Sequence, residues 1–261
     1  MTGTLRELMQ RRELLYILVW REIAVKYKQS VMGFLWAILM PGLIVLAGVV
    51  VKYAFASVSG TPLNGTDIAN VSVKAVPWAF FAASLRFATA SLIGNRELVT
   101  KVYLPREIFP VASVTAQFVD FCVASVLLAG VLIIARVGIS VQVLWVPVLV
   151  VLLALLCMGL GVFLSAASLF FRDVKYLVEA VITFAIFFTP VFYDTASVGR
   201  WGHLLMLNPV APLLEGLSAV IVYHRAPPLA WLGYSAAVTL LIWFLSNAFF
   251  RKMEPYFAET I

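Results

Sequence analysis

The stretch KYKQSVMGFLWAILMP, residues 26–41, changes from basic to apolar within three residues. Lys26 and Lys28 are charged, and no charged residue follows between Gln29 and Val51. A helix of about 20 apolar residues crosses the roughly 30 Å hydrocarbon core of a bilayer. The stretch therefore predicts the point at which the chain passes from water into lipid, and the start of its first membrane span.

The composition supports the same interpretation for the whole chain. Of 261 residues, 63% are hydrophobic and 12% are charged, whereas soluble domains usually carry about 25% charged residues. The mean hydropathy is +1.00. A net charge of +6 could indicate a nucleic-acid partner in a soluble protein, but in a membrane protein basic residues gather on the inner side and meet anionic lipid. We therefore expect an integral membrane protein surrounded by the lipid bilayer, with no nucleic-acid partner.

Six runs with few charged residues are long enough to cross a membrane. They lie at about 31–56, 75–94, 109–135, 143–170, 174–193 and 229–250. A further apolar stretch, 204–223, is interrupted by Pro209 and Pro212 and contains Glu215. Because prolines break helices and a lone carboxylate is costly in lipid, this stretch predicts two short re-entrant helices with a break near 208–212.

Basic residues set the orientation. With six spans, most Lys and Arg residues fall on the side of the N-terminus, and a seventh crossing would move Arg251 and Lys252 to the other side. The predicted fold is an all-α, single-domain membrane protein of residues 1–261. It comprises a cytoplasmic helix within 1–30, a six-span bundle over 31–250 and a cytoplasmic tail over 251–261, with both termini cytoplasmic.

Three water-facing segments are candidates for contacts with a partner. Residues 5–28 place apolar side chains mostly three or four apart, which predicts an amphipathic helix on the inner membrane surface, either a simple anchor or also a partner contact. The loop NRELVTKVYLPREIFP, 95–110, is longer than a hairpin turn needs. It predicts a short amphipathic helix, ending before Pro105, that docks on another protein; the alternative is a basic loop without a partner. The third segment is the next inner loop, where Arg172 and Asp173 fit either a contact with a partner or a charged stop at the membrane interface.

Charges and aromatic rings within the spans leave alternatives open. Arg86 and Asp120 lie near the middle of the second and third spans, where charged residues are candidates for function. They either pair with each other or leave Arg86 facing a pore and an anionic substrate group. Aromatic residues of the second and fifth spans either face lipid or line a pore on which sugar rings slide. The candidate channel-lining residues are Trp78, Phe81, Arg86, Phe187, Phe188 and Tyr193.

The chain offers no pattern typical of an enzyme. The two cysteines and two histidines lack metal-ligand spacing, and Asp67, Asp194 and Glu215 are scattered along the sequence. It also lacks the G-x-x-x-x-G-K-[ST] phosphate-binding loop. We expect no cofactor in this chain, and if ATP drives it, another chain binds the nucleotide.

Four segments together resemble a known family. They are WREIAVKYKQSVMGFLWAILMP at 20–41, LPREIFP at 104–110, SLFFRDVKYLVEAVITFAIFFTPVFY at 168–193 and LNPVAPLLEGL at 207–217. Their order and spacing resemble the permease subunit of ABC-2 type polysaccharide exporters, which include O-antigen, capsule and wall teichoic acid permeases. The resemblance covers nearly the whole chain.

The resemblance implies the fold of an ABC-2, type V exporter transmembrane domain and a homodimeric channel in the bacterial inner membrane. Two copies of a separate ATPase subunit would bind ATP and Mg, and a glycan linked to polyprenyl pyrophosphate would be the substrate. The loop would be a coupling helix on the ATPase, with Arg96, Glu97, Leu98, Lys101, Tyr103, Arg106 and Glu107 as contacts. The N-terminal helix would be an interface helix and gate, with Arg21, Lys26, Lys28, Gly33 and Trp36.

Other functions share some of these features. A related ABC-2 permease that exports a drug or a small lipid would have the same topology. An integral membrane glycosyltransferase would need clustered carboxylates or histidines, and an ion-coupled carrier would need internal repeats. Neither pattern is evident in the sequence.

Overall fold

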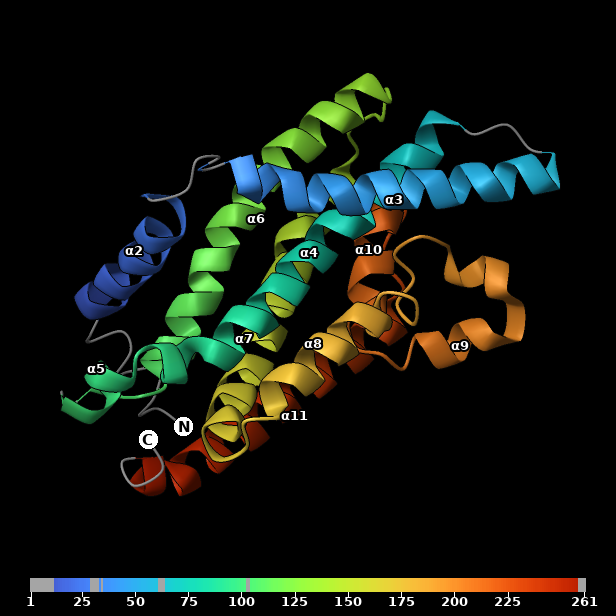
Figure 1. The fold of residues 1–261 in the computed structure, drawn as a ribbon. Helices are drawn as coiled ribbons and strands as arrows, with labels where there is room; N and C mark the ends of the chain where they lie inside the picture. Colours follow the sequence, from blue (N-terminus) through green and yellow to red (C-terminus); the bar gives the residue numbers. More distant parts are fainter. Residues whose placement is uncertain (1–11, 29–32, 34, 61–63, 102–103, 258–261) are drawn as a thin grey trace.

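The chain folds into a bundle of helices in the computed structural model (Figure 1), which describes residues 12–28, 33, 35–60, 64–101 and 104–257. The described part contains helices and turns but no strands. In chain order the helices are α2 (Arg12–Lys28), α3 (Leu35–Ser59), α4 (Gly65–Gly94), α5 (Arg96–Lys101), α6 (Ile108–Ile134), η1 (Val141–Trp145), α7 (Val146–Phe170), α8 (Val174–Ala185), η2 (Thr195–Trp201), α9 (Gly202–Leu205), α10 (Ala211–Ile221), α11 (Leu229–Met253) and η3 (Glu254–Tyr256).

Helix α4 is the centre of the bundle. It packs most extensively against α6 and α7 and also contacts α3, α8 and α10. Small side chains make this close packing possible, as they do at other membrane helix contacts. At Gly161 of α7, for example, an added Cβ would lie 2.8 Å from the Cβ of Ala88. Helix α4 contributes to both hydrophobic clusters of buried residues in the bundle.

Five helical segments within the described residues are long and apolar enough to cross a membrane. They contain α3, α4, α6, η1 with α7, and α11, and they agree with five of the six predicted spans. The predicted second span was too short, because α4 begins at Gly65 rather than near residue 75.

The predicted fifth span, 174–193, forms a different structure. Helix α8 has only 12 residues, and turns follow it. Pro190 explains the early end, because its ring has no N–H to donate and clashes with the carbonyl four residues earlier. Hydrogen bonds place both ends of this segment: the Ser168 hydroxyl donates to the Thr89 carbonyl, and Asn70 donates to Asp194. The chain between them thus runs back along α4 for about 28 Å, at 1.5 Å per residue.

The re-entrant segment has the predicted form of two short helical pieces with a break. Helices η2 and α9 lead into a turn over residues 206–210, and α10 follows. Two hydroxyls of α11 satisfy carbonyls in the turn: Tyr234 donates to Leu207 at 2.8 Å and Ser235 donates to Pro209 at 2.7 Å. Irregular backbone is tolerated at this position because neighbouring protein replaces water as its hydrogen-bond partner.

Helix α2 and the last described residues of the chain approach each other at one end of the bundle (Figure 1). Leu18 of α2, Val99 of α5, and Phe250 and Phe257 near the C-terminus belong to one hydrophobic cluster. A helix on the inner membrane surface was expected to lie across this end of the bundle, but α2 does not. It runs along the first half of α6, from Leu18 in this cluster to Lys26, which donates to Gln117 at 3.0 Å. Residues 5–11 of the predicted helix lie outside the described part.

Candidate functional site

Helix α5 presents a charged face at the end of the bundle where α2 meets the last described residues. Its side chains at Arg96, Glu97 and Lys101 are exposed, and Glu97 pairs with Lys101 one turn later at 3.4 Å. Val99 is buried beneath them and fixes the helix to the bundle. The helix is therefore short and amphipathic, as predicted. Leu98 is half-buried, and Tyr103 lies outside the described residues.

Arg106 and Glu107 differ from the other residues predicted to contact a partner. Arg106 donates to the Glu254 carbonyl at 2.5 Å, and its guanidinium lies 5.7 Å from the centre of the Phe257 ring. Glu107 is mostly buried and lies 3.8 Å from Arg251. These two side chains hold the loop against the C-terminal end of α11, and their contact with another protein stays a prediction. Arg172 and Asp173 in the next inner loop are exposed.

The predicted interface helix is fixed to the bundle at two positions. Arg21 donates to the Asn95 side chain, at the junction of α4 and α5. Farther along, Lys26 and Tyr27 both donate to the Asp120 carboxylate, and the Lys26 ammonium lies 4.9 Å from the centre of the Phe87 ring. Lys28 is exposed. Two of the three basic residues assigned to this helix therefore have partners within the chain.

Gly33 and Trp36 lie at the entry to α3. Gly33 has φ of 49°, in the left-handed region where glycine alone pays no steric penalty. Its carbonyl accepts a bond from the Trp36 amide at 3.4 Å. The turn that redirects the chain into the first span therefore depends on this glycine.

The predicted pair of Arg86 and Asp120 does not form. The Arg86 Nε donates to Glu179 of α8 at 2.8 Å, while Asp120 binds Lys26 and Tyr27 of α2. The prediction considered only the two spans joined by the loop. In the folded chain α2 and α8 bring their own charged side chains to the same region, and each charge there is paired, as burial in a low dielectric requires.

A cavity of about 600 Å³ lies among α2, α3, α4, α6 and α8. Its charged and polar lining residues are Lys26, Arg86, Gln117, Asp120 and Thr183, and Trp36 and Trp78 belong to its aromatic wall. Of the predicted channel-lining residues, only Trp78 and Arg86 lie in this wall. Phe81 is buried in the core, Phe187 and Phe188 are exposed, and Tyr193 donates to the Phe187 carbonyl at 2.9 Å.

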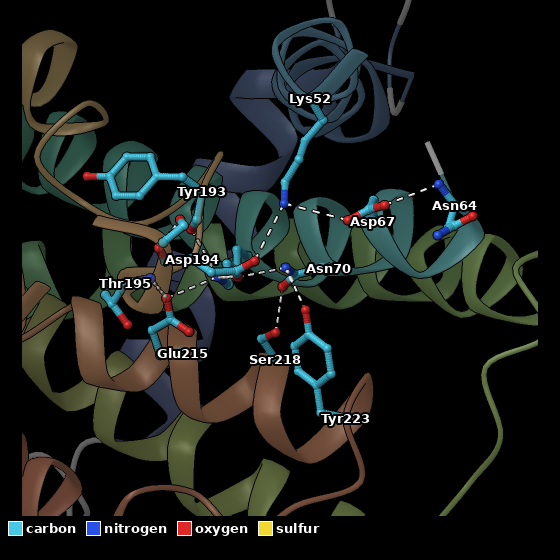
Figure 2. A network of polar contacts seen from close by, with 12 residues as sticks. Lys52, Asn64, Asp67, Asn70, Tyr193, Asp194, Thr195, Glu215, Ser218 and Tyr223 are labelled. Atoms are coloured by element: carbon cyan, nitrogen blue, oxygen red, sulfur yellow. Dashed lines mark hydrogen bonds and ion pairs between the residues drawn. The ribbon is translucent and has the colours of Figure 1, made fainter. Parts of the chain in front are cut away.

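A polar network lies at the opposite end of the bundle, and Lys74 of α4 is at its centre. Figure 2 shows the residues that surround this lysine. This lysine is 1% exposed. Its ammonium lies 2.6 Å from Asp194 and 3.1 Å from Glu215, and it also donates to the Tyr193 carbonyl at 3.2 Å. The three partners come from the re-entrant segment and the chain that enters it, so the lysine joins this segment to the central helix.

Neighbouring side chains extend the network. Asn70, one turn before Lys74, donates to Asp194 at 2.8 Å and accepts from Ser218 at 2.5 Å. Lys52 of α3 lies 3.5 Å from Asp194 and 3.7 Å from Asp67. Burial alone would raise the pKa of Asp194, but the charges of Lys74 and Lys52 and hydrogen bonds from Lys74 and Asn70 lower it below its ordinary value.

The sequence analysis missed this network because it treated the acidic residues as scattered. One signal could have revealed part of it. Asp67, Asn70 and Lys74 are three, four and seven residues apart, which places them on one face of a helix. That face becomes visible only when α4 is extended back to Gly65.

A family model described as ABC-2 type transporter matches residues 13–222, most of the chain. The chain belongs to the ABC-2 type transporter family. The match runs from α2 into the end of α10, so the region shared with other ABC-2 transporters includes α5, the cavity and nearly all of the polar network. Together with its long apolar helices, this membership makes the chain a multi-pass membrane protein.

Curated relatives are similar to this ABC-2 transporter along its length. The O-antigen export system permease protein RfbA of Myxococcus xanthus is 28% identical over 268 residues, which cover 100% of both chains. Two proteins of the same name from Klebsiella pneumoniae are 23% and 22% identical over 256 residues, 95% of each chain. All three relatives are named for transport rather than for catalysis.

Proposed function

We propose that the chain is the membrane-embedded permease subunit of an ATP-driven exporter. Its substrate is a lipid-linked polysaccharide, O-antigen or a similar cell-surface glycan, which moves from the cytoplasmic to the outer side of the bacterial inner membrane. The observation that carries this proposal is the similarity to an O-antigen export permease over 100% of both chains. A match of this extent includes every helix of the bundle rather than a single motif.

The proposed assembly contains two copies of this chain and two copies of a separate ATPase, which binds ATP and Mg. The exposed charges of Arg96, Glu97 and Lys101 support α5 as the ATPase contact. Both described ends of the chain lie beside α5, which supports cytoplasmic termini and an even number of crossings. The segment over α8 and the following turns would be the sixth crossing.

In the proposed cycle this chain forms no covalent bond with its substrate. The ATPases approach each other when they bind ATP, and their motion reaches the permease through α5. A glycan linked to polyprenyl pyrophosphate enters from the inner leaflet. Packed helices move between discrete arrangements rather than deform continuously, and substrate or nucleotide shifts the balance only through different affinities for the two states.

A second candidate, export of a drug or small lipid, is favoured by one observation. The cavity of about 600 Å³ falls within the roughly 300–1,000 Å³ typical of small-molecule sites. Full-length similarity to the named O-antigen permeases favours the glycan.

Reconstitution separates the two candidates. The chain is purified in complex with its ATPase partner and placed in proteoliposomes that contain either a lipid-linked glycan or hydrophobic drugs. We expect ATP-dependent movement of the glycan by the complex and none by the permease alone. Movement of drugs or short lipids without the glycan would overturn the proposal in favour of the second candidate.

A further inference from the structure

Helix α5 is too short to hold its position alone. It has six residues, Arg96–Lys101, whereas isolated helices shorter than about 12–15 residues are marginal in water. Val99 is its one buried side chain, and a single buried side chain does not fix the direction in which the exposed charges point. The position of α5 therefore depends on the chain segments that flank it on both sides.

The segment before α5 is fixed by Asn95. Its carbonyl accepts bonds from the amides of Leu98 and Val99 at 2.9 and 3.0 Å. Its side chain donates to the Ser91 carbonyl at 2.7 Å and accepts from Arg21. Asn95 thus ties the first turn of α5 to α4, in which Ser91 lies, and to α2, in which Arg21 lies.

The segment after α5 is fixed by the C-terminal end of α11. This helix ends at Met253, and Glu254 is its C-cap residue. The last carbonyls of a helix have no partner within the helix and carry partial negative charge. Arg106, in the loop between α5 and α6, donates to the Glu254 carbonyl at 2.5 Å. A cation from this loop therefore caps α11, where the hydrogen bond and the helix dipole both favour it.

Glu107 makes the complementary contact at the start of α6. It is the N-cap residue of that helix, at the end where partial positive charge favours a carboxylate. Its Oε1 lies 3.8 Å from the Nε of Arg251, in the last turn of α11. Two neighbouring residues of opposite charge, Arg106 and Glu107, therefore join the start of α6 to the end of α11.

Phe257 completes this junction. It is fully buried, and the centre of its ring lies 5.1 Å from that of Phe250 and 5.9 Å from that of Phe170. The Arg106 guanidinium lies 5.7 Å from the same ring centre, within the roughly 6 Å at which a cation is attracted to an aromatic face. Phe257 also belongs to the same hydrophobic cluster as Val99 of α5. Residues 254–257, here called the C-terminal turn, thus contact the loop after α5 and share its core.

We propose that the C-terminal turn positions α5 for the ATPase, with Arg106 and Phe257 as positioning residues. The inference rests on the proposed function, because α5 is the ATPase contact only in that proposal. While the turn holds the loop, α5 is ordered before the ATPase arrives, so less conformational entropy is lost on binding. The family model matches residues 13–222, so a part of the chain beyond that match acts on a helix within it.

The mobility of α5 is measured first, in the full-length chain in nanodiscs without the ATPase. A nitroxide on Thr100→Cys in a Cys122→Ser background reports on α5, because Thr100 is exposed and Cys157 is buried. A nitroxide on the native, exposed Cys122 is the reference on α6. Phe257→Ala and Arg106→Met should each shorten the rotational correlation time at position 100 about twofold or more and leave that at Cys122 unchanged.

ATPase binding and glycan export are then measured with the unlabelled variants. Because α5 must now be ordered on binding, the Kd for the ATPase partner should rise about tenfold, while export at saturating ATPase stays within about twofold of the parent. Arg106→Lys keeps a cation at the end of α11 and should return the Kd to within about threefold of the parent. The matched controls are Arg225→Met, an exposed arginine outside the junction, and Phe244→Ala, an exposed phenylalanine of α11. Both controls should bind as the parent does.

Thermal unfolding separates positioning from stability. Arg106→Met leaves Phe257 in place, so it tests the proposal even where Phe257→Ala lowers the yield of folded chain. Parental mobility at position 100 in Arg106→Met would overturn the proposal. An equal gain in mobility at Cys122 would also overturn it, because the whole fold would then have loosened, and so would an unchanged Kd. A parent chain that binds no ATPase would instead contradict the proposed function, while the mobility of α5, measured without the ATPase, would still decide whether the turn fixes this helix.

Discussion

Replacing Lys74 by methionine tests whether the buried network holds the re-entrant segment to α4. Methionine keeps most of the side-chain length and removes the charge. Removal of one partner from a buried ion pair typically costs about 3–5 kcal/mol. Here the carboxylates left behind keep some solvent and other partners: Asp194 is 29% exposed and near Lys52, while Glu215 is 15% exposed and accepts from the Thr195 amide at 3.0 Å. We therefore expect the lower end of the range, about 3 kcal/mol.

The change can be measured through the cysteines of the chain. Cys157 is buried in α7 and Cys122 is exposed. In a Cys122→Ser background, a thiol-reactive dye therefore reports the unfolding of the core. For proteins of this size 1 kcal/mol corresponds to about 2–4 °C in Tm, so Lys74→Met should lower Tm by roughly 6–12 °C.

Lys52→Met is the matched control. Lys52 is 19% exposed and its ion pairs are longer, 3.5 and 3.7 Å, so its loss should cost less than about 1 kcal/mol. Adding Glu215→Gln to Lys74→Met should restore part of the loss, because it removes one of the two carboxylate charges that have lost the lysine. The reasoning fails if Lys74→Met unfolds at the temperature of the parent, or if its Tm falls no further than that of Lys52→Met.

Three further outcomes can be checked with the same protein. Gly48→Ala should destabilise the folded chain by roughly 1–3 kcal/mol and so lower its Tm, because the added Cβ would lie 2.4 Å from the Val71 side chain and overpack the core. The control Gly42→Ala has nothing within 4 Å of its added Cβ and should be neutral or slightly stabilising. Equal effects of the two substitutions on Tm would contradict this description of the packing. Because the folded pKa of Asp194 is lowered, its stabilisation is complete above about pH 4 and is lost as pH falls through the folded pKa. The Tm difference between the parent and Asp194→Asn should therefore shrink below about pH 4. A Tm difference that does not change with pH would count against stabilisation by the ionised Asp194 carboxylate. Charge reversal at Arg96 and Glu97 should uncouple ATP hydrolysis from export in the complex without loss of folded chain, and unchanged export would remove α5 as the ATPase contact.

Most of the spans could be predicted because bilayer thickness fixes the length of an apolar helix. The third span, expected at 109–135, is Ile108–Ile134, and the last, expected from 229, begins at Leu229. The same criterion failed at the start of α4, because it took Lys74 as the boundary of the second span. Lys74 lies inside the helix, where Asp194 and Glu215 neutralise it. A criterion based on solvation alone does not detect charges that the fold pairs internally.

The partners of the intramembrane charges could not be predicted for a related reason. Arg86 and Asp120 are near each other in chain order, but a salt bridge depends on which helices approach each other in space. Glu179 is 93 residues from Arg86 in sequence, and Asp120 is 94 residues from Lys26. The charge-free runs predict how deep in the membrane each residue of a helix lies, but not which helices are its neighbours. They therefore identify the charged residues within the membrane but not the residues with which these pair.

The position of α2 connects two parts of the molecule that the sequence suggested separately. Lys26 belongs to the cavity wall and Arg21 binds Asn95, the residue before α5. They are five residues apart on one helix, about 7.5 Å along its axis. A helix transmits displacement along its length because its backbone hydrogen bonds resist deformation. If α5 contacts the ATPase, as proposed, then α2 joins that contact to the wall of the cavity through one rigid element. A displacement of α5 then reaches Lys26 and its partner Asp120 through α2, which gives the energy-coupling surface a direct physical link to the charges within the membrane.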